Sequence, residues 1–246
     1  MNNYQQQIEL ELQFWKLEVM KKPSLMGNIA TKVQGKINSY IPQKVHKAIT
    51  VAIKQMVKAV LFGSEVTSSN MPPGEMSLIH HEALVKSKID SYCKTGAAEG
   101  GITGAGGFLM SMADFPILIA IKIKLLYEIA ALYGFDTSDF RERLYILHIF
   151  QMAFSSQAGS QKVLAQMENW EDKLFLLPES GDGFNWQTFQ QEYRDYIDLA
   201  KLAQLLPIVG AAVGAVANYH LIKKLGKTAM MCYRMRKLKT EGGLIR

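Results

Sequence analysis

The sequence has few cysteines, and they show no arrangement typical of a zinc site or a structural disulfide. Cys93 and Cys232 are the two cysteines among 246 residues, they lie far apart, and neither belongs to a C-x-x-C pair. Such cysteines are expected to be buried thiols in a reducing compartment. The first twenty residues also lack a basic start, a continuous apolar run and a small-residue cleavage site, which argues against a secretory signal. We therefore expect a cytoplasmic protein.

Standard catalytic motifs are also missing. The chain has no phosphate-binding GxxxxGK[ST] and no GxSxG nucleophile turn. The string GITGAGGFL follows no predicted strand and has its third glycine misplaced for a dinucleotide site. In HHEALV, which begins at His80, a zinc-protease helix would need histidine where Val85 stands. We expect no metal and no cofactor, and the sequence favours a non-enzymatic protein without deciding the matter.

Strand signals are nearly absent, because apolar residues recur at three- and four-residue spacing and no segment alternates between tight turns. This pattern predicts an all-α protein, a single compact multi-helix bundle formed by residues 1–246. No break is long enough to indicate a linker between domains. The expected helices are 4–21, 27–40, 43–62, 75–94, 96–113, 115–133, 138–157, 160–176, 186–205 and 207–236.

Two helix boundaries have a specific expected chemistry. Gly134 follows an apolar run and can adopt the left-handed conformation that ends a helix, after which Asp136 can accept backbone amides of the next helix. Pro116 fits the first turn of a helix and not its middle, so a helix is expected to stop near Asp114, with Asp114 capping a new one.

Two rows of glycines stand out in otherwise apolar segments. Gly96, Gly100 and Gly104 share a four-residue spacing, and Gly210 and Gly214 share it further along the chain. Each glycine inside a helix costs about 1 kcal/mol relative to alanine. We therefore predict that these two helices pack in the core with their glycine rows in contact. The alternative is that each groove receives a large side chain from another helix.

The residues around these rows resemble those of a known family. The run EGGITGAGGFLMSMADFPILIAIKIKLLYEIAALYGFD, then RERLYIL and the late LPIVGAAVGAVANYHLIKKLGKTAM, is similar to the EcsC family of bacterial proteins. Trp15 and IPQKV at 41–45 fit the N-terminal half of the family, whereas 158–185 shows no family pattern. The family takes its name from a gene beside those of an ABC transporter linked to secretion. The resemblance therefore implies an accessory role at a membrane and no defined reaction.

Several polar residues lie in apolar surroundings and are candidates for a pocket. A buried carboxylate must be hydrogen-bonded, paired or neutralised, and Glu99 lies beside the first glycine row. If the two rows cross, Glu99 and Asn218 come close together; otherwise Glu99 faces solvent. The candidate pocket residues are Glu99, Asp114, Arg143, Asn218 and Tyr219.

The net charge of +6 is concentrated in two places. From His220 onward eight basic residues face one acidic residue, a local net charge of +7. A predicted helix at 43–62 places lysines on one side and Val45, Ile49, Ile53, Met56 and Val60 on the other. These residues are candidates for binding an anionic surface: Lys44, Lys47, Lys54, Lys58, Lys223, Lys224, Lys227, Arg234, Arg236, Lys237 and Lys239.

The stretch Leu202–Ile222 carries 21 uncharged residues, long enough to span a bilayer. It also contains Gln204, Pro207 and Asn218 with much glycine and alanine, so a core helix fits it better. The basic tail lacks a nucleic-acid reading motif, which disfavours nucleic acid as a partner.

The leading hypothesis is a non-enzymatic protein on the inner face of the membrane that accompanies an ABC-type export system. One alternative is an enzyme or binding protein for a lipid-like ligand that uses the candidate pocket. A further alternative is conditional insertion of the glycine-rich helices into the bilayer. The sequence leaves the oligomeric state open.

Overall fold

The structure is a computed structural model that describes residues 3–21, 43–62, 77–105, 107–181, Phe184, Phe189 and 211–243. Every regular element in these ranges is helical, which confirms the predicted all-α class. The predicted helix at 27–40 lies outside the described ranges, as does the one at 186–205 apart from Phe189. The elements are α1 (Asn3–Met20), α3 (Gln43–Phe62), α4 (Leu78–Ala105), α5 (Gly107–Leu132), α6 (Phe140–Phe154), α7 (Gln157–Met167), α8 (Trp170–Lys173), the short 3-10 helix η1 (Leu174–Leu176) and α11 (Ala211–Gly243).

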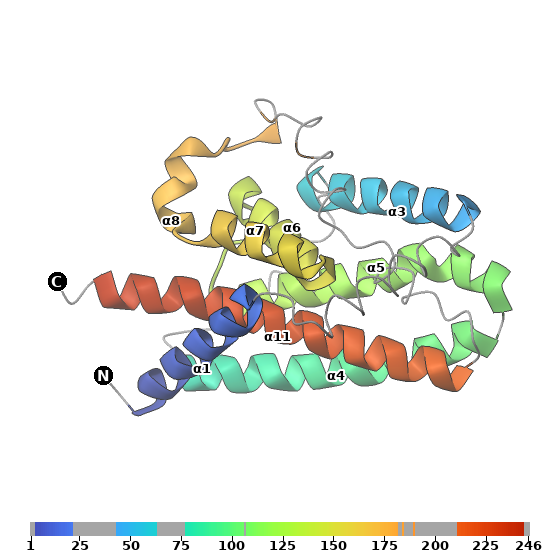
Figure 1. The fold of residues 1–246 in the computed structure, drawn as a ribbon, viewed down its shortest axis with the longest axis horizontal. Helices are drawn as coiled ribbons and strands as arrows, with labels where there is room; N and C mark the ends of the chain where they lie inside the picture. Colours follow the sequence, from blue (N-terminus) through green and yellow to red (C-terminus); the bar gives the residue numbers. More distant parts are fainter. Residues whose placement is uncertain are drawn as a thin grey trace.

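The long helices α4 and α11 form the centre of the bundle. They run side by side in opposite directions, and α5 packs against both (Figure 1). Helices α3 and α6 lie against α5, and α1 crosses α11 and contacts α7. Because α11 also contacts α6, it is in contact with helices on several sides.

The core is rich in aromatic side chains where α11 meets the α5–α6 connection. Tyr133 stacks on Tyr233 with ring centroids 5.4 Å apart. Phe135 and Tyr145 also contact the Tyr233 ring, at 5.1 and 5.5 Å. Offset and edge contacts of this kind add to the energy of burying the rings. They hold the last third of α11 against α5 and α6.

The connection between α5 and α6 confirms one of the two predicted boundaries. Gly134 has φ of 80°, and its amide donates to Ala131 O while the amide of Phe135 donates to Ala130 O. This is the left-handed helix ending that glycine favours. The residue that caps α6 is Asp139, whose side chain accepts from the Arg141 amide at 2.8 Å. Asp136 instead accepts from Ser138 within the turn, so its predicted capping role is wrong.

The predicted boundaries near Gly96 and Pro116 are corrected by the structure. Helix α4 runs unbroken through Gly96, and α5 runs unbroken through Pro116. The predicted stop near Asp114 is therefore wrong: α4 ends at Ala105 and α5 begins at Gly107, within the glycine run. A proline inside a helix removes one backbone hydrogen bond. Packing of α5 against α3, α4 and α11 offsets this loss.

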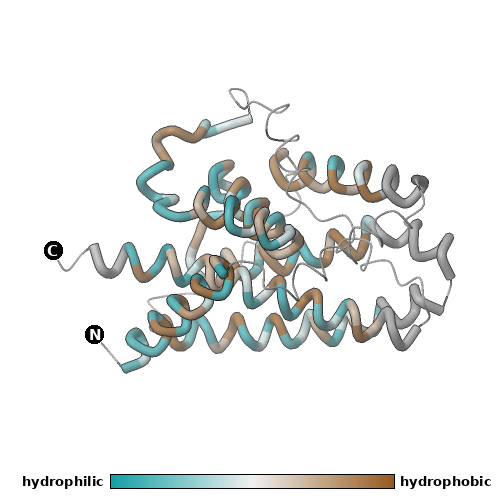
Figure 2. Tube along the Cα trace, viewed as in Figure 1, coloured by the Kyte–Doolittle hydropathy of each residue, from teal (hydrophilic) through white to brown (hydrophobic). Residues whose placement is uncertain are grey.

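Figure 2 shows polar residues in the coloured part of each long helix. Within the described ranges, no helix combines the length and the apolar character needed to cross a bilayer. Residues 202–210 of the candidate span lie outside those ranges.

Candidate functional site

Two of the predicted pocket residues lie near a lysine that is not among the predicted site residues. Lys122 of α5 is 1% exposed, and its Nζ donates to Asn218 Oδ1 at 3.0 Å and to Leu118 O at 3.1 Å. Burial lowers the pKa of Lys122 to about 7, while the charge of Glu99 acts in the opposite direction. The buried amine therefore joins α5 to α11 by a hydrogen bond, and the charge of Glu99 on α4 acts on it. A lysine with such a pKa can exchange a proton near neutral pH.

The remaining predicted pocket residues have other surroundings. Arg143 donates to Leu61 O at 3.1 Å and Thr137 O at 3.0 Å, so it links the end of α3 to the α5–α6 turn. Tyr219 is half-buried and makes an edge contact with His220. Asp114 belongs to α5, and its side chain lies outside the described part of the structure.

Two glycines mark close contacts between α4 and α11. The Gly96 position of α4 faces the Ile222 side chain, and the Gly226 position of α11 faces the Ile89 side chain. At these two positions a side chain fills the space above a glycine. The surroundings of Gly100, Gly104, Gly210 and Gly214 lie outside the described part, so contact between the two predicted rows stays a prediction.

The structure corrects the predicted role of two arginines. Arg234 is 2% exposed and was expected on a surface that binds anions. Its Nε and Nη2 donate to the two oxygens of Glu82 at 2.6 and 2.5 Å, and its Nη1 donates to Glu11 at 2.6 Å. Tyr4 and Tyr133 donate to the same Glu82 carboxylate. The guanidinium is therefore satisfied inside the bundle and inaccessible to a membrane.

Arg236 is equally withdrawn from the surface, on the other side of α11. It donates to Glu142 at 2.5 Å and to Glu171 at 2.6 Å, and its guanidinium lies 3.8 Å from the centre of the Phe135 ring. Tyr233 donates to Glu142 at 2.6 Å. Burial raises the pKa of Glu142, and the charge of Arg236 opposes that rise. Each arginine faces two carboxylates, so the two clusters are structural connections in which positive charge is fully compensated.

The sequence contains one signal for these clusters. Arg234 and Arg236 stand in the string MMCYRMRKL, where their neighbours are mostly apolar. Arginine is preferred over lysine for buried pairing because its planar group binds a carboxylate through two hydrogen bonds. Their partners are not recognisable from the sequence, since Glu82 lies 152 residues from Arg234.

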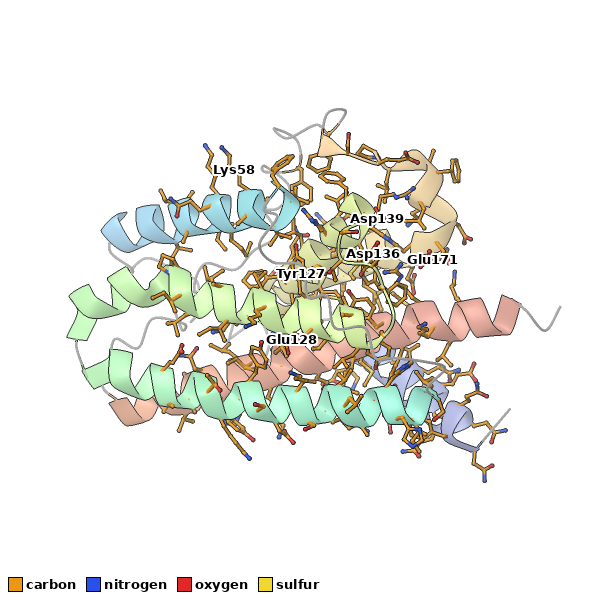
Figure 3. All side chains as sticks on the ribbon, turned by 180° about the vertical axis from the view of Figure 1, so that it is seen from behind. Lys58, Tyr127, Glu128, Asp136, Asp139 and Glu171 are labelled. Atoms are coloured by element: carbon orange, nitrogen blue, oxygen red, sulfur yellow. The ribbon has the colours of Figure 1, made fainter. Side chains whose placement is uncertain are left out.

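Helix α3 presents the clearest basic surface in the described part of the chain. It contains four lysines and no acidic residue. Ile49, Met56 and Val60 are buried, as the pattern predicts, and Lys54 and Lys58 are exposed. Lys58 points away from α5 in Figure 3.

The exposed side of α3 also carries large apolar residues. Val51 is 54% exposed and Phe62 is 52% exposed. Their positions fall in the same helical row as Lys54 and Lys58. The side chains of Lys44 and Lys47, in the first turns of the same helix, lie outside the description. We call this exposed side, formed by Val51, Lys54, Lys58 and Phe62, the α3 surface.

The other predicted basic residues divide between exposed and engaged side chains. Lys223, Lys224 and Lys227 are exposed on α11. Lys239 is hydrogen-bonded to Asn169, and the Lys237 ammonium lies 5.2 Å from the centre of the Phe135 ring. The C-terminal segment therefore offers less accessible positive charge than its sequence indicates.

Helix α1 exposes an unusual apolar stripe. Ile8, Leu12 and Trp15 are buried against the bundle, while the opposite side exposes Leu10 by 54%, Phe14 by 68%, Leu17 by 63% and Met20 by 57%. Isolated exposed apolar residues are common, but a contiguous row of them marks an interaction surface. We call these four residues the α1 stripe.

These features define a class: all-α proteins built on a long antiparallel helix pair, with buried arginine–carboxylate clusters and exposed surfaces suited to docking. The chain belongs to the EcsC protein family, whose model matches residues 6–238. It is 44% identical to protein EcsC of Bacillus subtilis (strain 168) over 229 residues, which cover 93% of this chain and 94% of that protein. It is 29% identical to the uncharacterized protein YdbA of the same strain over 147 residues, which cover 59% of this chain and 54% of that protein. No solved structure matches the chain significantly.

Proposed function

We propose that this protein is a non-enzymatic accessory protein that attaches peripherally to the cytoplasmic face of the membrane and serves an ABC-type export system. The observation that carries the membrane part is the α3 surface, where exposed lysines and exposed apolar side chains share one side of a helix without acidic residues. Because the apolar side of α3 is buried in the bundle, its contact with lipid comes from the exposed lysines and from Val51 and Phe62. The family resemblance supports the transporter part.

The energetics of the α3 surface favour anionic lipid. Each lysine near an anionic membrane contributes about 1 kcal/mol, an attraction that salt screens within about 10 Å. Val51 and Phe62 add apolar contact that salt does not weaken. Membrane binding therefore requires anionic lipid, and the apolar part of the binding energy persists at high salt.

Vesicle flotation tests this proposal. Neutral phosphatidylcholine vesicles are compared with vesicles that also contain phosphatidylglycerol, at low and high salt. We expect recovery with the anionic vesicles alone. The Lys54→Gln/Lys58→Gln variant should lose about 2 kcal/mol, a roughly 30-fold weaker partition.

The charge-matched control is Lys86→Gln/Lys94→Gln, which removes two exposed lysines from α4. This control should bind like the parent protein. Equal loss in the two variants, or equal recovery on neutral vesicles, would exclude α3 as the membrane-binding element.

The alternative role, a binding protein for a lipid-like ligand, was expected at Glu99, Asp114 and Asn218. At that place the structure has Lys122 donating to Asn218. A hollow of about 270 Å³ lies elsewhere, between α1, α6, α7 and α11.

A further inference from the structure

The two most exposed large apolar side chains in the described part of the chain are neighbours in the short helix η1. Phe175 is 81% exposed and Leu176 is 71% exposed. The residues on either side of them, Leu174 and Leu177, pack against the core. Four consecutive apolar residues therefore divide into an inner pair that anchors the segment and an outer pair that faces solvent. We call the outer pair, Phe175 and Leu176, the η1 tip.

The η1 tip is held in place by hydrogen bonds at its base. The Lys173 ammonium donates to Gln166 O at 3.0 Å and to Glu168 O at 2.8 Å, which fastens the start of η1 to the end of α7. The amide of Leu177 donates to Leu174 O at 3.2 Å and closes the turn. Side chains that are already held outward lose little conformational freedom on binding. The exposed pair therefore has the properties of an interaction surface.

The chain that follows η1 runs to the C-terminal end of α3. Gly181 packs so closely on the Phe62 ring that a Cβ atom there would lie 2.2 Å from Phe62 Cε1. The Phe140 ring lies 6.3 Å from the Phe62 ring and 5.5 Å from the Phe184 ring. The α8–η1 segment and α3 both lie on the side of the molecule away from α4 (Figures 1 and 3). The η1 tip therefore belongs to the same side as the α3 surface.

We propose that the η1 tip inserts among the lipid acyl chains while the lysines of the α3 surface bind the anionic headgroups. This inference rests on the proposed membrane attachment and names the element that enters the bilayer. Burial of Phe175 and Leu176 gains free energy in proportion to the apolar area removed from water, and neither side chain has a polar atom to desolvate. The position of the tip on the same side as the exposed lysines Lys54 and Lys58 favours an anionic membrane over a protein as its partner.

Two acidic residues beside the η1 tip limit how deeply it enters the membrane. Asp172 and Glu179 are exposed, and their carboxylates lie 3.8 Å from the nearest side-chain nitrogens of Lys239 and Arg141. Moving a carboxylate into the acyl region is strongly unfavourable. Insertion therefore stops near the boundary between headgroups and acyl chains, at a depth of about 5–10 Å.

Vesicle flotation at high salt tests the inference, because salt weakens the lysine contribution and spares the apolar one. On vesicles that contain phosphatidylglycerol, the Phe175→Ser/Leu176→Ser variant should partition about 30-fold or more weakly than the parent. Leu10→Ser/Phe14→Ser removes the same two residue types from the α1 stripe and should bind like the parent. Circular dichroism verifies that each variant is folded.

A fluorescent label measures insertion directly. Cys93 and Cys232 are buried, so the environment-sensitive dye NBD reacts with a cysteine introduced by Phe175→Cys. Emission of this dye should rise and shift to the blue on anionic vesicles, because the dye leaves water. The same dye attached through Leu10→Cys should show no change.

The outcomes separate this inference from the membrane proposal. Equal partition of the parent and the Phe175→Ser/Leu176→Ser variant, or an unchanged dye signal at position 175 on bound vesicles, would overturn the inference and leave attachment through α3 intact. A dye response on native membranes without one on protein-free vesicles would assign the tip to a protein and also overturn the inference. If the parent fails to bind anionic vesicles, the membrane proposal and the inference fail together.

Discussion

Lys122 shows how one residue connects two helices, α5 and α11, at an electrostatic cost. Its amine is held by Leu118 and Asn218 in a region from which water is excluded, so the charged form is penalised. The penalty appears as a pKa of about 7, far below the ordinary value for lysine. Lys122 should therefore contribute measurably to the pH dependence of the free energy of unfolding.

We predict that the stability difference between the parent protein and Lys122→Met changes with pH. Between pH 7 and the ordinary lysine pKa, the unfolded chain binds a proton at Lys122 that the folded protein does not bind. The contribution of Lys122 to the free energy of unfolding of the parent protein therefore rises with pH, by up to about 1.4 kcal/mol per pH unit. A methionine at this position has no such dependence, because its side chain does not titrate.

The measurement is urea unfolding of the two proteins at several pH values between about 7 and 9.5. Throughout this range, the free energy of unfolding of the parent should increase relative to that of Lys122→Met as the pH rises. Lys124→Met, at an exposed neighbouring position, should follow the parent. A constant difference between the parent and Lys122→Met would show that Lys122 keeps its charge in the folded state.

At the scale of the helices, α4 and α11 interlock through reciprocal glycines. A Cβ atom at position 226 would lie 2.6 Å from Ile89 Cγ1 and 2.9 Å from Ile89 Cγ2. These atoms are attached directly to the Ile89 Cβ, and isoleucine has one strongly preferred χ1 rotamer in a helix, so they move less readily than the end of a side chain. At Gly96 the close neighbour is Ile222 Cδ1, the end of a flexible side chain. The two glycines therefore differ in how strictly they are required.

We predict that Gly226→Ala lowers the free energy of unfolding by about 1–2 kcal/mol, because overpacking exceeds the gain in helix propensity. Gly96→Ala should change it by less than about 0.5 kcal/mol, because Ile222 can adopt another rotamer. Chemical denaturation provides both values. Ile89→Ala should partly rescue Gly226→Ala, and similar effects at the two glycines would contradict the interlock.

The sequence predicts the helices well and their boundaries less well. Periodicity locates α1, α3 and α11 to within a few residues except at the C-terminal end of α11, because amphipathic patterns arise from local spacing. Gly96 and Pro116 were expected to interrupt helices, yet neither does. The tendency of glycine and proline to interrupt a helix applies to isolated helices. In this protein, tertiary packing overrides that tendency. The Gly134 turn was predictable because its φ is required locally.

At the scale of the whole molecule, the two candidate docking surfaces face different ways. Helix α3 lies at one side of the bundle on α5 and α6, whereas α1 lies at the other end on α11 and α7 (Figures 1 and 3). The α3 surface is basic. The charges of α1 are Glu9, Glu11, Glu18 and Lys16, a net charge of −2 from three acids and one base. Under the proposal of membrane attachment, charge complementarity therefore places α3, and not α1, toward an anionic membrane.

We predict that the α1 stripe binds the transporter partner while α3 holds the membrane. The Leu10→Ser/Phe14→Ser/Leu17→Ser variant should float with anionic vesicles like the parent but fail to co-purify with the subunits of an ABC transporter from native membranes. The Lys54→Gln/Lys58→Gln variant, returned to the membrane by a fused anchor, should retain the transporter. Co-purification undiminished by the serine substitutions would remove α1 from this role.

Long-range pairing explains why the sites were harder to predict than the fold. Arg234 and Arg236 belong to a stretch with a net charge of +7, and nothing near them in the sequence indicates that they are neutralised. Their partners Glu82 and Glu142 lie 152 and 94 residues away. Lys122 was missed because a single lysine in an apolar helix usually extends to solvent. Asn218 and Glu99, in contrast, were identifiable as polar residues beside small ones.

The alternation of Arg234 and Arg236 on opposite sides of α11 has a consequence for biosynthesis. A ribosome completes α11 after every other described helix, so until then Glu82 and Glu142 have no guanidinium to neutralise them. Burying a carboxylate alone is strongly unfavourable, and the nascent chain must keep both acids hydrated. We therefore expect the bundle to close fully only after translation has passed Arg236.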